Sequence, residues 1–207
     1  MFKNKKQESV PLRKILLCLF ALLLAASSCF AAEISQPTDE KKVVNTKPTI
    51  AILYVNNAKT TYDKELTTKI MTNLDTQLKN YTIIAGDQYI ERLNKVGISD
   101  ITTSERTDIV DAFKGEAIDY VLFVELQPFV RKERITVFTY GIDMTAVMPI
   151  KIIDLKNNKY LYNGKLTEFA TDSCVFGLVG NKSVSLLALD KILGKMNVII
   201  KDRLPNS

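Results

Sequence analysis

The sequence predicts an α/β (α+β) fold: a single, three-layer-like domain with one mixed β-sheet and the order β-α-β-α-α-β-β-β-α. Three observations predict it. Apolar runs typical of buried strands alternate with amphipathic helices up to residue 126, strand-like segments then follow one another directly, and a long amphipathic helix closes the chain. Residues 48–207 have the length of about one domain, so all of these elements are assigned to it.

The first half of this domain alternates strands and helices. Residues 49–55 and 119–126 are almost continuous apolar runs, as expected of strands covered on both faces, and residues 81–85 indicate a shorter buried strand. Large apolar residues recur every four positions in residues 63–79, which is typical of a helix with one buried face. These segments predict the layered part of the fold.

Two short helices are expected before the third strand. Asp87 is suited to be the N-cap of a helix over residues 88–95, which Gly97 ends. Residues 102–105 have the spacing of a capping box, so we expect them to open a helix that continues through Ala117.

The second half consists of strands in sequence. Residues 134–155 are rich in β-branched and aromatic residues and indicate one long strand, in which Gly141 and Pro149 suggest a bulge and a bend. The turn sequence of residues 156–159 then predicts a β-hairpin with a strand over residues 160–169.

The last predicted element is a helix over residues 183–204. Its N-cap is expected at Asn181 or Ser183, after a loop that contains glycines. This loop matches a phosphate-binding loop only in part, because Asn181 separates Gly180 from Lys182. We therefore expect no nucleotide to bind there.

The first 32 residues have the three parts of an export signal. A basic start precedes an apolar run from Ile15 to Ala26, and small residues follow up to Ala32. The run has about twelve residues, fewer than the roughly twenty that a membrane-spanning helix needs. We therefore expect an exported protein in the periplasm or on the outer surface of a bacterial envelope.

Two kinds of processing remain open at this signal. Signal peptidase I would cut after Ala31 and release a soluble protein. Alternatively, residues 26–29 resemble a lipobox, in which case Cys29 would carry a lipid and attach the protein to a membrane. Residues 33–47 are polar with little apolar periodicity, which predicts a flexible linker before the domain.

Removing the signal changes the charge and the cysteine count. Five of the 28 lysines and arginines, but only one of the 23 acidic residues, lie in residues 1–32, so the exported chain has a net charge of about +1. This balance gives no reason to expect a nucleic-acid partner. Of the three cysteines only Cys174 remains in the domain. A buried thiol is expected there, against an exposed thiol that pairs with a second chain.

The composition excludes several kinds of catalysis. The chain contains no histidine, which excludes Ser-His-Asp and Cys-His arrangements and metal sites that use histidine. The acidic residues along the predicted strands have no fixed separation, so no glycosidase pair is indicated. These residues are Asp119, Glu125, Asp143, Asp154 and Glu168. Carboxylate or lysine chemistry stays open without a motif for it, and we expect no enzyme, cofactor or metal.

Two segments resemble a known family. Residues 113–122 look like the helix-to-strand entry of the bacterial envelope domains typified by the curli secretion-channel lipoprotein (CsgG-like), and residues 150–162 look like that family's hairpin. The family's turn commonly reads Asp-x-x-Thr-Gly-Lys, and Asn157-Asn158 stands here in place of Thr-Gly. Similar domains occur in TolB's amino-terminal module and in lipoprotein activators of penicillin-binding proteins.

The resemblance implies a non-catalytic domain that binds other envelope proteins, and it carries over no catalytic residue. The chain has no spare length for the membrane-spanning hairpins of the curli channel, so a pore is not expected. The predicted function is a protein-interaction module that helps to assemble or regulate a secretion or cell-wall complex. The alternative is a periplasmic carrier of a small or lipidic ligand, which the apolar loop before the last helix suggests.

Two segments are candidate partner contacts. The first is that apolar loop, which either contacts a partner or packs onto the domain's own core. The second is a charged cluster where the third strand is expected to turn into the fourth. It indicates a solvated hairpin tip or a contact with anionic head groups or cell-wall polymer. The residues concerned are Val175, Phe176, Leu178 and Val179 in the loop and Arg131, Lys132 and Arg134 in the cluster.

Overall fold

The computed structural model describes residues 47–175 and 179–205, which belong to one compact unit, Thr46–Ser207. The predicted export signal lies outside the described residues, as do Cys29 with its two processing routes and the predicted linker up to residue 46. Phe176 and Leu178 of the apolar loop lie outside them as well.

Six strands of the described chain form one mixed sheet, which confirms the predicted fold class. β2, β1 and β3 are parallel to one another, whereas β5 runs antiparallel to β3, β4 and β6. The strands are β1 (Thr49–Asn56), β2 (Thr82–Ala85), β3 (Tyr120–Leu126), β4 (Val130–Ile135), β5 (Tyr140–Asp154) and β6 (Lys159–Cys174).

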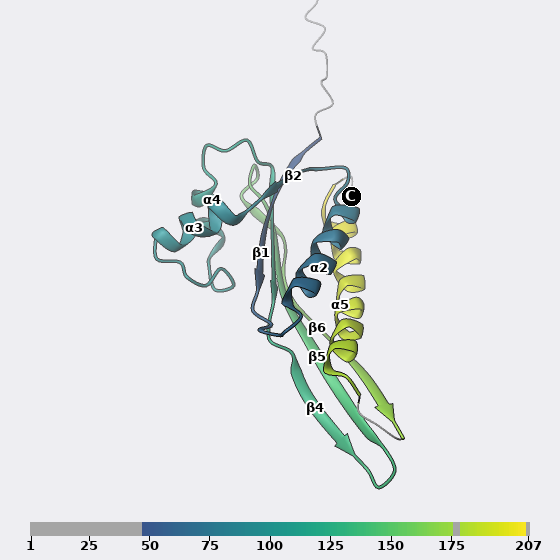
Figure 1. Ribbon diagram of the computed structural model, residues 1–207. Coiled ribbons are helices and arrows are strands. Elements are labelled where there is room, and N and C mark those ends of the chain that lie inside the picture. Colours follow the sequence, from purple (N-terminus) through teal and green to yellow (C-terminus); the bar gives the residue numbers. More distant parts are fainter. Residues whose placement is uncertain (1–46, 176–178, 206–207) are drawn as a thin grey trace, which may run out of the picture. The chain divides into compact units, whose positions relative to one another are not determined.

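Four helices of the described chain cover this sheet. α2 and α5 lie against one face, and α3 and α4 lie on the other face, next to the parallel strands (Figure 1). The helices are α2 (Asp63–Gln77), α3 (Asp87–Lys95), α4 (Arg106–Ala112) and α5 (Asn181–Arg203).

Side chains of the central strands alternate between two apolar cores, because neighbours along a strand point to opposite faces. Ile50 and Ile52 of β1 join the core under α2 and α5, whereas Ala51 and Leu53 join the smaller core under α3 and α4. All four side chains are buried. β1 is thus covered on both faces, as its continuous apolar sequence predicts.

The structure has one strand more than the predicted order. β4 occupies the charged segment that was expected to be a solvated hairpin tip, so the predicted turn is wrong, whereas the segment is exposed as expected. β6 pairs with β5 along its whole length, and β3 and β4 therefore share the other edge of β5. β3 pairs there with residues 150–154 and β4 with residues 140–145. The observed order is β-α-β-α-α-β-β-β-β-α.

β2 differs from the prediction of a buried strand over residues 81–85. It lies at the edge of the sheet, where Thr82 and Ala85 are exposed and Ile83 and Ile84 are half-buried. An edge strand has a neighbour on one side only, so the helices that cover the central strands protect it incompletely. Tyr81, just before it, is the buried residue of this segment.

Asp87 is the first residue of α3 rather than its N-cap, which is Gly86. A side chain has no room at position 86, because a Cβ there would overlap the carbonyl oxygen of Ile52 and lie 2.5 Å from Leu53 Cδ2. The close packing of the helix start against β1 therefore selects glycine as the cap.

α4 is shorter than predicted, because it begins later and ends earlier. Its N-cap is Glu105, whose backbone N–H donates to Asp108 Oδ2 at 3.1 Å, and the helix ends at Ala112 instead of Ala117. The expected cap Thr102 is held in a turn by Asp100, to which its backbone N–H donates at 2.8 Å. The capping chemistry is present, but it starts three residues later.

α5 carries the expected buried stripe, and its start differs slightly from the prediction. The N-cap is Gly180, neither Asn181 nor Ser183, and the Ser183 hydroxyl donates to the Gly180 carbonyl at 2.8 Å. The buried side chains of the stripe include Leu189, Ile192, Leu193, Met196 and Ile200.

β5 has no bulge at Gly141 or Pro149, which both stay in register with β6. The register shift lies between Ile152 and Ile153 instead. Pro149 lies opposite the break between β3 and β4, where one edge of β5 has no paired strand. A proline is tolerated there because its missing N–H costs no ladder hydrogen bond on that edge.

We expect Gly86→Ala to lower the free energy of unfolding by about 2 kcal/mol, because the added Cβ meets backbone that cannot move aside cheaply. Urea unfolding followed by circular dichroism measures this change. Gly194→Ala in α5 is the matched control, since no other group lies within 4 Å of its new Cβ. It should raise stability by about 0.5–1 kcal/mol. Equal stability of the Gly86 variant and the parent would contradict the close approach.

Candidate interaction surface

Lys151 is a buried cation on β5, and its ammonium group holds the connection between α3 and α4 against the sheet. It donates to the carbonyl oxygens of Ile101 at 3.0 Å and Ser104 at 2.8 Å. Burial lowers the pKa of Lys151 below its usual value of 10.5, and the nearby Asp100 carboxylate opposes that shift. Because its ammonium donates hydrogen bonds to these backbone carbonyls, Lys151 has a structural role and attaches the α3–α4 connection to the sheet.

We expect Lys151→Met to lower the free energy of unfolding by about 1–3 kcal/mol at neutral pH, because two carbonyl groups lose their donor. The parent should gain stability relative to the variant as the pH rises toward 10.5. In that window the unfolded lysine still binds a proton that the folded one has begun to release. Unfolding in urea at several pH values measures both effects, and a stability difference that falls with pH would contradict the lowered pKa.

The five carboxylates noted along the predicted strands all have structural partners. Asp119 accepts from Thr49 N–H, Glu125 from the Asn57 amide, and Asp154 from Asn157 N–H, while Asp143 and Glu168 form ion pairs with Arg134 and Lys195. Among residues 47–175 and 179–205, no group of three or more acidic or cysteine side chains is placed to hold a metal. Three of these carboxylates therefore serve turns and strand ends, and Asp143 and Glu168 form ion pairs from within β5 and β6.

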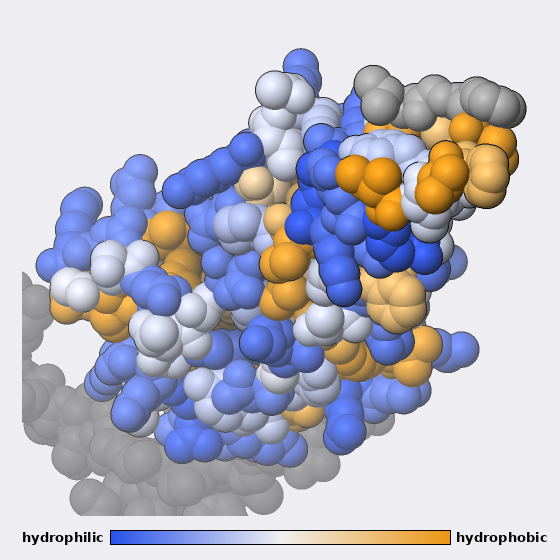
Figure 2. Space-filling model, turned by 90° about the horizontal axis from the view of Figure 1, so that it is seen from below, coloured by the Kyte–Doolittle hydropathy of each residue, from blue (hydrophilic) through white to orange (hydrophobic). Residues whose placement is uncertain are grey.

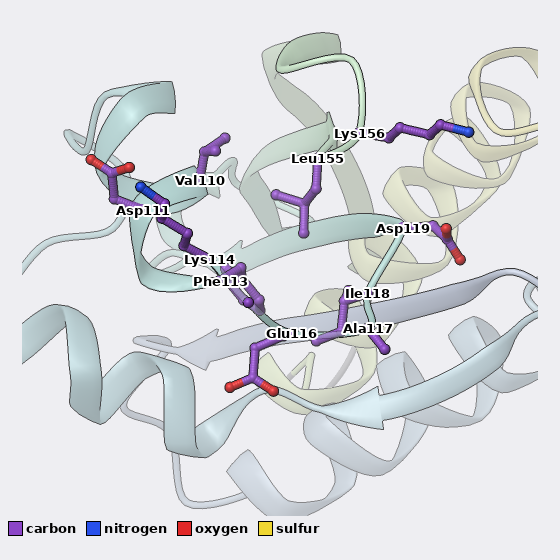
Figure 3. A pocket seen from close by; sticks show the side chains of 11 residues that line it. Val110, Asp111, Phe113, Lys114, Glu116, Ala117, Ile118, Asp119, Leu155 and Lys156 are labelled. Carbon is purple, nitrogen blue, oxygen red and sulfur yellow. The ribbon is translucent and has the colours of Figure 1, made fainter.

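A cavity of about 590 Å³ lies beside the start of β3 and the β5–β6 turn (Figure 3). Phe113 and Leu155 line it, while Asp111 and Lys156 lie at its opposite sides and extend outward. Glu116, also in its lining, is engaged in an ion pair with Arg92 at 2.8 Å. The cavity adjoins the amino end of β3, whereas ligands of open α/β sheets bind beyond the carboxyl ends of parallel strands. No set of polar groups converges in it.

β4, residues 140–148 of β5 and residues 166–174 of β6 form a three-stranded ribbon that continues past the parallel strands (Figure 1). One face of this ribbon packs against α5. Met144 and Met148 of β5 and Leu166 and Ala170 of β6 are buried there, in the core that α5 covers. Within residues 47–175 and 179–205, helix packing supports the ribbon on this face.

No helix of the described chain lies over the opposite side of the ribbon (Figure 1), and we call it the open face. Val130 and Phe169 are 61% and 63% exposed on it. At the β6 edge of this face, Lys191 of α5 reaches Phe169: its ammonium lies 5.4 Å from the ring centroid and donates to the Phe169 carbonyl at 2.9 Å. Pairing in register places Val130 and Phe169 beside Thr145, because residues directly opposite in antiparallel strands point to the same face. Its members are Val130, Lys132, Arg134, Asp143, Thr145, Val147, Pro149, Lys165, Thr167, Phe169 and Thr171.

The charged cluster predicted as one unit is divided between the two faces. Arg131 is on the α5 side, where its guanidinium donates to Asn181 Oδ1 at 2.8 Å and to the Tyr140 hydroxyl at 2.7 Å. Arg134 is on the open face and pairs with Asp143 at 3.0 Å. Lys132 is exposed on the open face and has no ion pair with any described residue. Lys132 is thus the member that remains available to a partner.

The β4–β5 turn presents an apolar end that the sequence did not reveal. Ile135, Val137 and Phe138 are 72%, 90% and 77% exposed, and we call residues 135–139 the tip. These residues were assigned to the interior of one long strand because Val and Phe are strand formers and no Gly, Asn or Pro marks a turn there. The sequence does contain one sign of this turn, the two threonines Thr136 and Thr139, which close the turn by hydrogen bonds.

The apolar loop before α5 begins beside this end of the ribbon. Tyr140 pairs with Cys174, so Val175 follows directly next to the tip, and it is 59% exposed. Val179 packs against the main core instead, which is the other outcome expected for this loop. Cys174 is free and only half-buried, so the expected full burial of its thiol is not observed. The structure thus brings the two predicted contact segments together at one end.

Figure 2 looks from below onto this end of the domain and shows apolar residues gathered at one corner. Hydrophilic residues border that corner on the side toward the rest of the domain. A group of exposed apolar side chains of this kind typically marks a contact with another molecule. The candidate surface is therefore the ribbon, with its open face and its tip.

Comparison with known proteins gives a distant likeness in fold. No protein-family model matches the chain, and no curated protein matches its sequence. Lipoprotein GNA1162 from Neisseria meningitidis is 12% identical, with a TM-score of 0.42 over 72% of this chain and 97% of that one. The hypothetical protein CT253 from Chlamydia trachomatis is 12% identical, with a TM-score of 0.47 over 75% and 98%.

A third solved structure is the C-terminal domain of LpoB from Salmonella enterica, 13% identical, with a TM-score of 0.33 over 59% of this chain and 83% of that one. Of these three structures GNA1162 is a lipoprotein, and the likeness of this chain to it is distant and concerns the chain path alone. The likeness to the curli channel and TolB stays a prediction. Within the described residues, no helix has both the length and the apolar character to cross a membrane.

Proposed function

We propose that the chain is a non-catalytic, exported module of the cell envelope that binds another envelope protein through the open face of its ribbon. It would thereby help to assemble or regulate a secretion or cell-wall complex. The observation that supports this most strongly is a sheet face on which Val130 and Phe169 are mostly exposed although the same strands are buried on their other side.

The side chains of the open face indicate which side chains a partner would present to it. Its centre is formed by Val130, Val147 and Phe169, and Lys132 and Lys165 lie toward its ends. Neither lysine has an ion pair among the described residues. An apolar centre with a charged rim is the usual composition of a protein interface. The partner is expected to offer apolar side chains framed by carboxylates.

The location of this binding follows from the sequence. The export signal in residues 1–32 directs the chain out of the cytosol, and the polar linker, with or without a lipid on Cys29, would let the domain reach its partner from a membrane or from solution. The sequence contains no histidine, so catalysis that depends on an imidazole is not open to this chain. Binding to another protein requires no such catalytic group.

The test is crosslinking in intact cells of the native host. A photoreactive amino acid at position 130 or 167, both exposed on the open face, should give one specific crosslinked protein. The same amino acid at position 96, exposed at the end of α3, is the control and should give none. Products of equal yield at positions 96 and 130, or no product at any position on the open face, would contradict the proposal.

Charge reversal provides a second prediction. Lys132→Glu combined with Lys165→Glu should lower the yield of that product by at least about tenfold, because carboxylates would then face carboxylates. The matched control is Lys95→Glu combined with Lys114→Glu, which changes the net charge equally on exposed residues near α3 and α4. The proposal fails if both double variants crosslink as well as the parent.

A further inference from the structure

From the tip we infer a second binding activity, separate from the open face: the β4–β5 turn inserts into the interfacial region of a lipid bilayer. Ile135, Val137 and Phe138 would enter the acyl boundary while the cations of β4 remain at the depth of the head groups. The inserted residues of the tip are not part of the proposed protein interface, whereas Lys132 and Arg134 belong to the open face as well. The inference does not depend on the protein contact, and the variants at Val137 and Phe138 test it alone.

The first argument is the exposure of the tip. Val137 is 90% and Phe138 77% exposed, although valine and phenylalanine are side chains that burial in an apolar medium favours. They stand at the end of a hairpin, so the apolar surface projects outward and forms no groove. A fluid bilayer adapts to a projecting apolar group, whereas a rigid protein must offer a matching pocket. The shape therefore favours lipid.

The second argument is that the turn satisfies much of its own polar chemistry. The backbone N–H of Thr136 donates to the Thr139 carbonyl at 2.9 Å, and the Thr136 hydroxyl accepts from the N–H of Thr139 at 2.9 Å and of Phe138 at 3.4 Å. The two threonine hydroxyls also bond to each other at 2.7 Å. A segment can leave water only if its polar groups find such internal partners. Because the threonines bond within the turn, Val137 and Phe138 form the surface that faces outward.

The third argument is the arrangement of charge behind the tip. No acidic residue occurs between Arg134 and Ile142. On the strand that leads to the turn, Arg131 pairs with Glu133 and Arg134 pairs with Asp143 of β5, while Lys132 has no ion pair among the described residues. At about 3.3 Å per residue, Arg134 lies roughly 10 Å behind Val137. Amphipathic segments bury their apolar side about 5–10 Å into the boundary between head groups and acyl chains. Arg134, with its partner Asp143, is therefore placed at phosphate depth, and the unpaired Lys132 lies roughly 7 Å farther from the acyl boundary.

Binding to vesicles tests the inference directly. The exported full chain with Cys29→Ala, so that no lipid can be attached, is mixed with vesicles of phosphatidylcholine alone or with phosphatidylglycerol. We expect binding to both, stronger for the anionic vesicles. Val137→Asp should weaken it at least about tenfold, because a charge replaces an inserted side chain. The control Val96→Asp, at a valine that is 71% exposed on the far side of the domain, should bind as the parent does.

The contribution of the cations is tested separately. Lys132→Gln should reduce binding to the anionic vesicles roughly fivefold and leave binding to phosphatidylcholine unchanged. Lys95→Gln at the end of α3 is the matched control and should change neither. If the Lys95 and Lys132 variants lost affinity equally, attraction would come from overall charge, and the assigned depth of β4 would be wrong.

The depth of insertion has its own readout, because the chain contains no tryptophan. Phe138→Trp places a single indole at the tip. Its emission should shift to the blue on adding vesicles and be quenched by lipids brominated on the acyl chains, whereas Val96→Trp should show neither change. The inference is overturned if the folded Phe138→Trp protein shows no shift and no quenching, or if the indole responds only when a purified protein partner is added.

Discussion

The pairing of β5 with β6 is the constraint on which the rest of the structure depends. It runs in register from Tyr140 opposite Cys174 to Asp154 opposite Lys159, with one shift near the β5–β6 turn. Residues 150–154 of β5, next to that turn, pair antiparallel with β3 and so attach β5 to the parallel strands. Residues 140–145 pair with β4 and form the ribbon. A single strand thus joins the layered body to the surface that we assign to binding.

The sequence predicted the layered body well because burial imposes simple patterns. A strand covered on both faces has to be apolar throughout, as in β1 and β3, and a helix with one buried side shows the four-residue period of α2. Helix ends were less predictable. Whether Asp87 or Gly86 caps α3 depends on the space beside Ile52, which is a property of the packed structure rather than of the local sequence.

The ribbon was harder to predict because its turn uses strand-forming residues. Val137 and Phe138 normally mark the interior of a strand, so an apolar turn is hidden within an apolar segment. The sequence pointed to the charged residues before it as one cluster, but register decides the role of each. Alternation sends Arg131 to the side of α5 and Lys132 to the open face, and a linear cluster cannot show that. Val175 and the tip meet only because Tyr140 pairs with Cys174.

The continuity of β5 also has a mechanical consequence. A pull applied at the ribbon's end and directed along the strands would load the β5–β6 ladder in shear, so that many hydrogen bonds resist together. A sideways pull would instead open the bonds one after another from the end. Because α5 packs along one face, the ribbon would move as a stiff unit. A displacement at its end would then be transmitted through β5 to β3, with which β5 pairs.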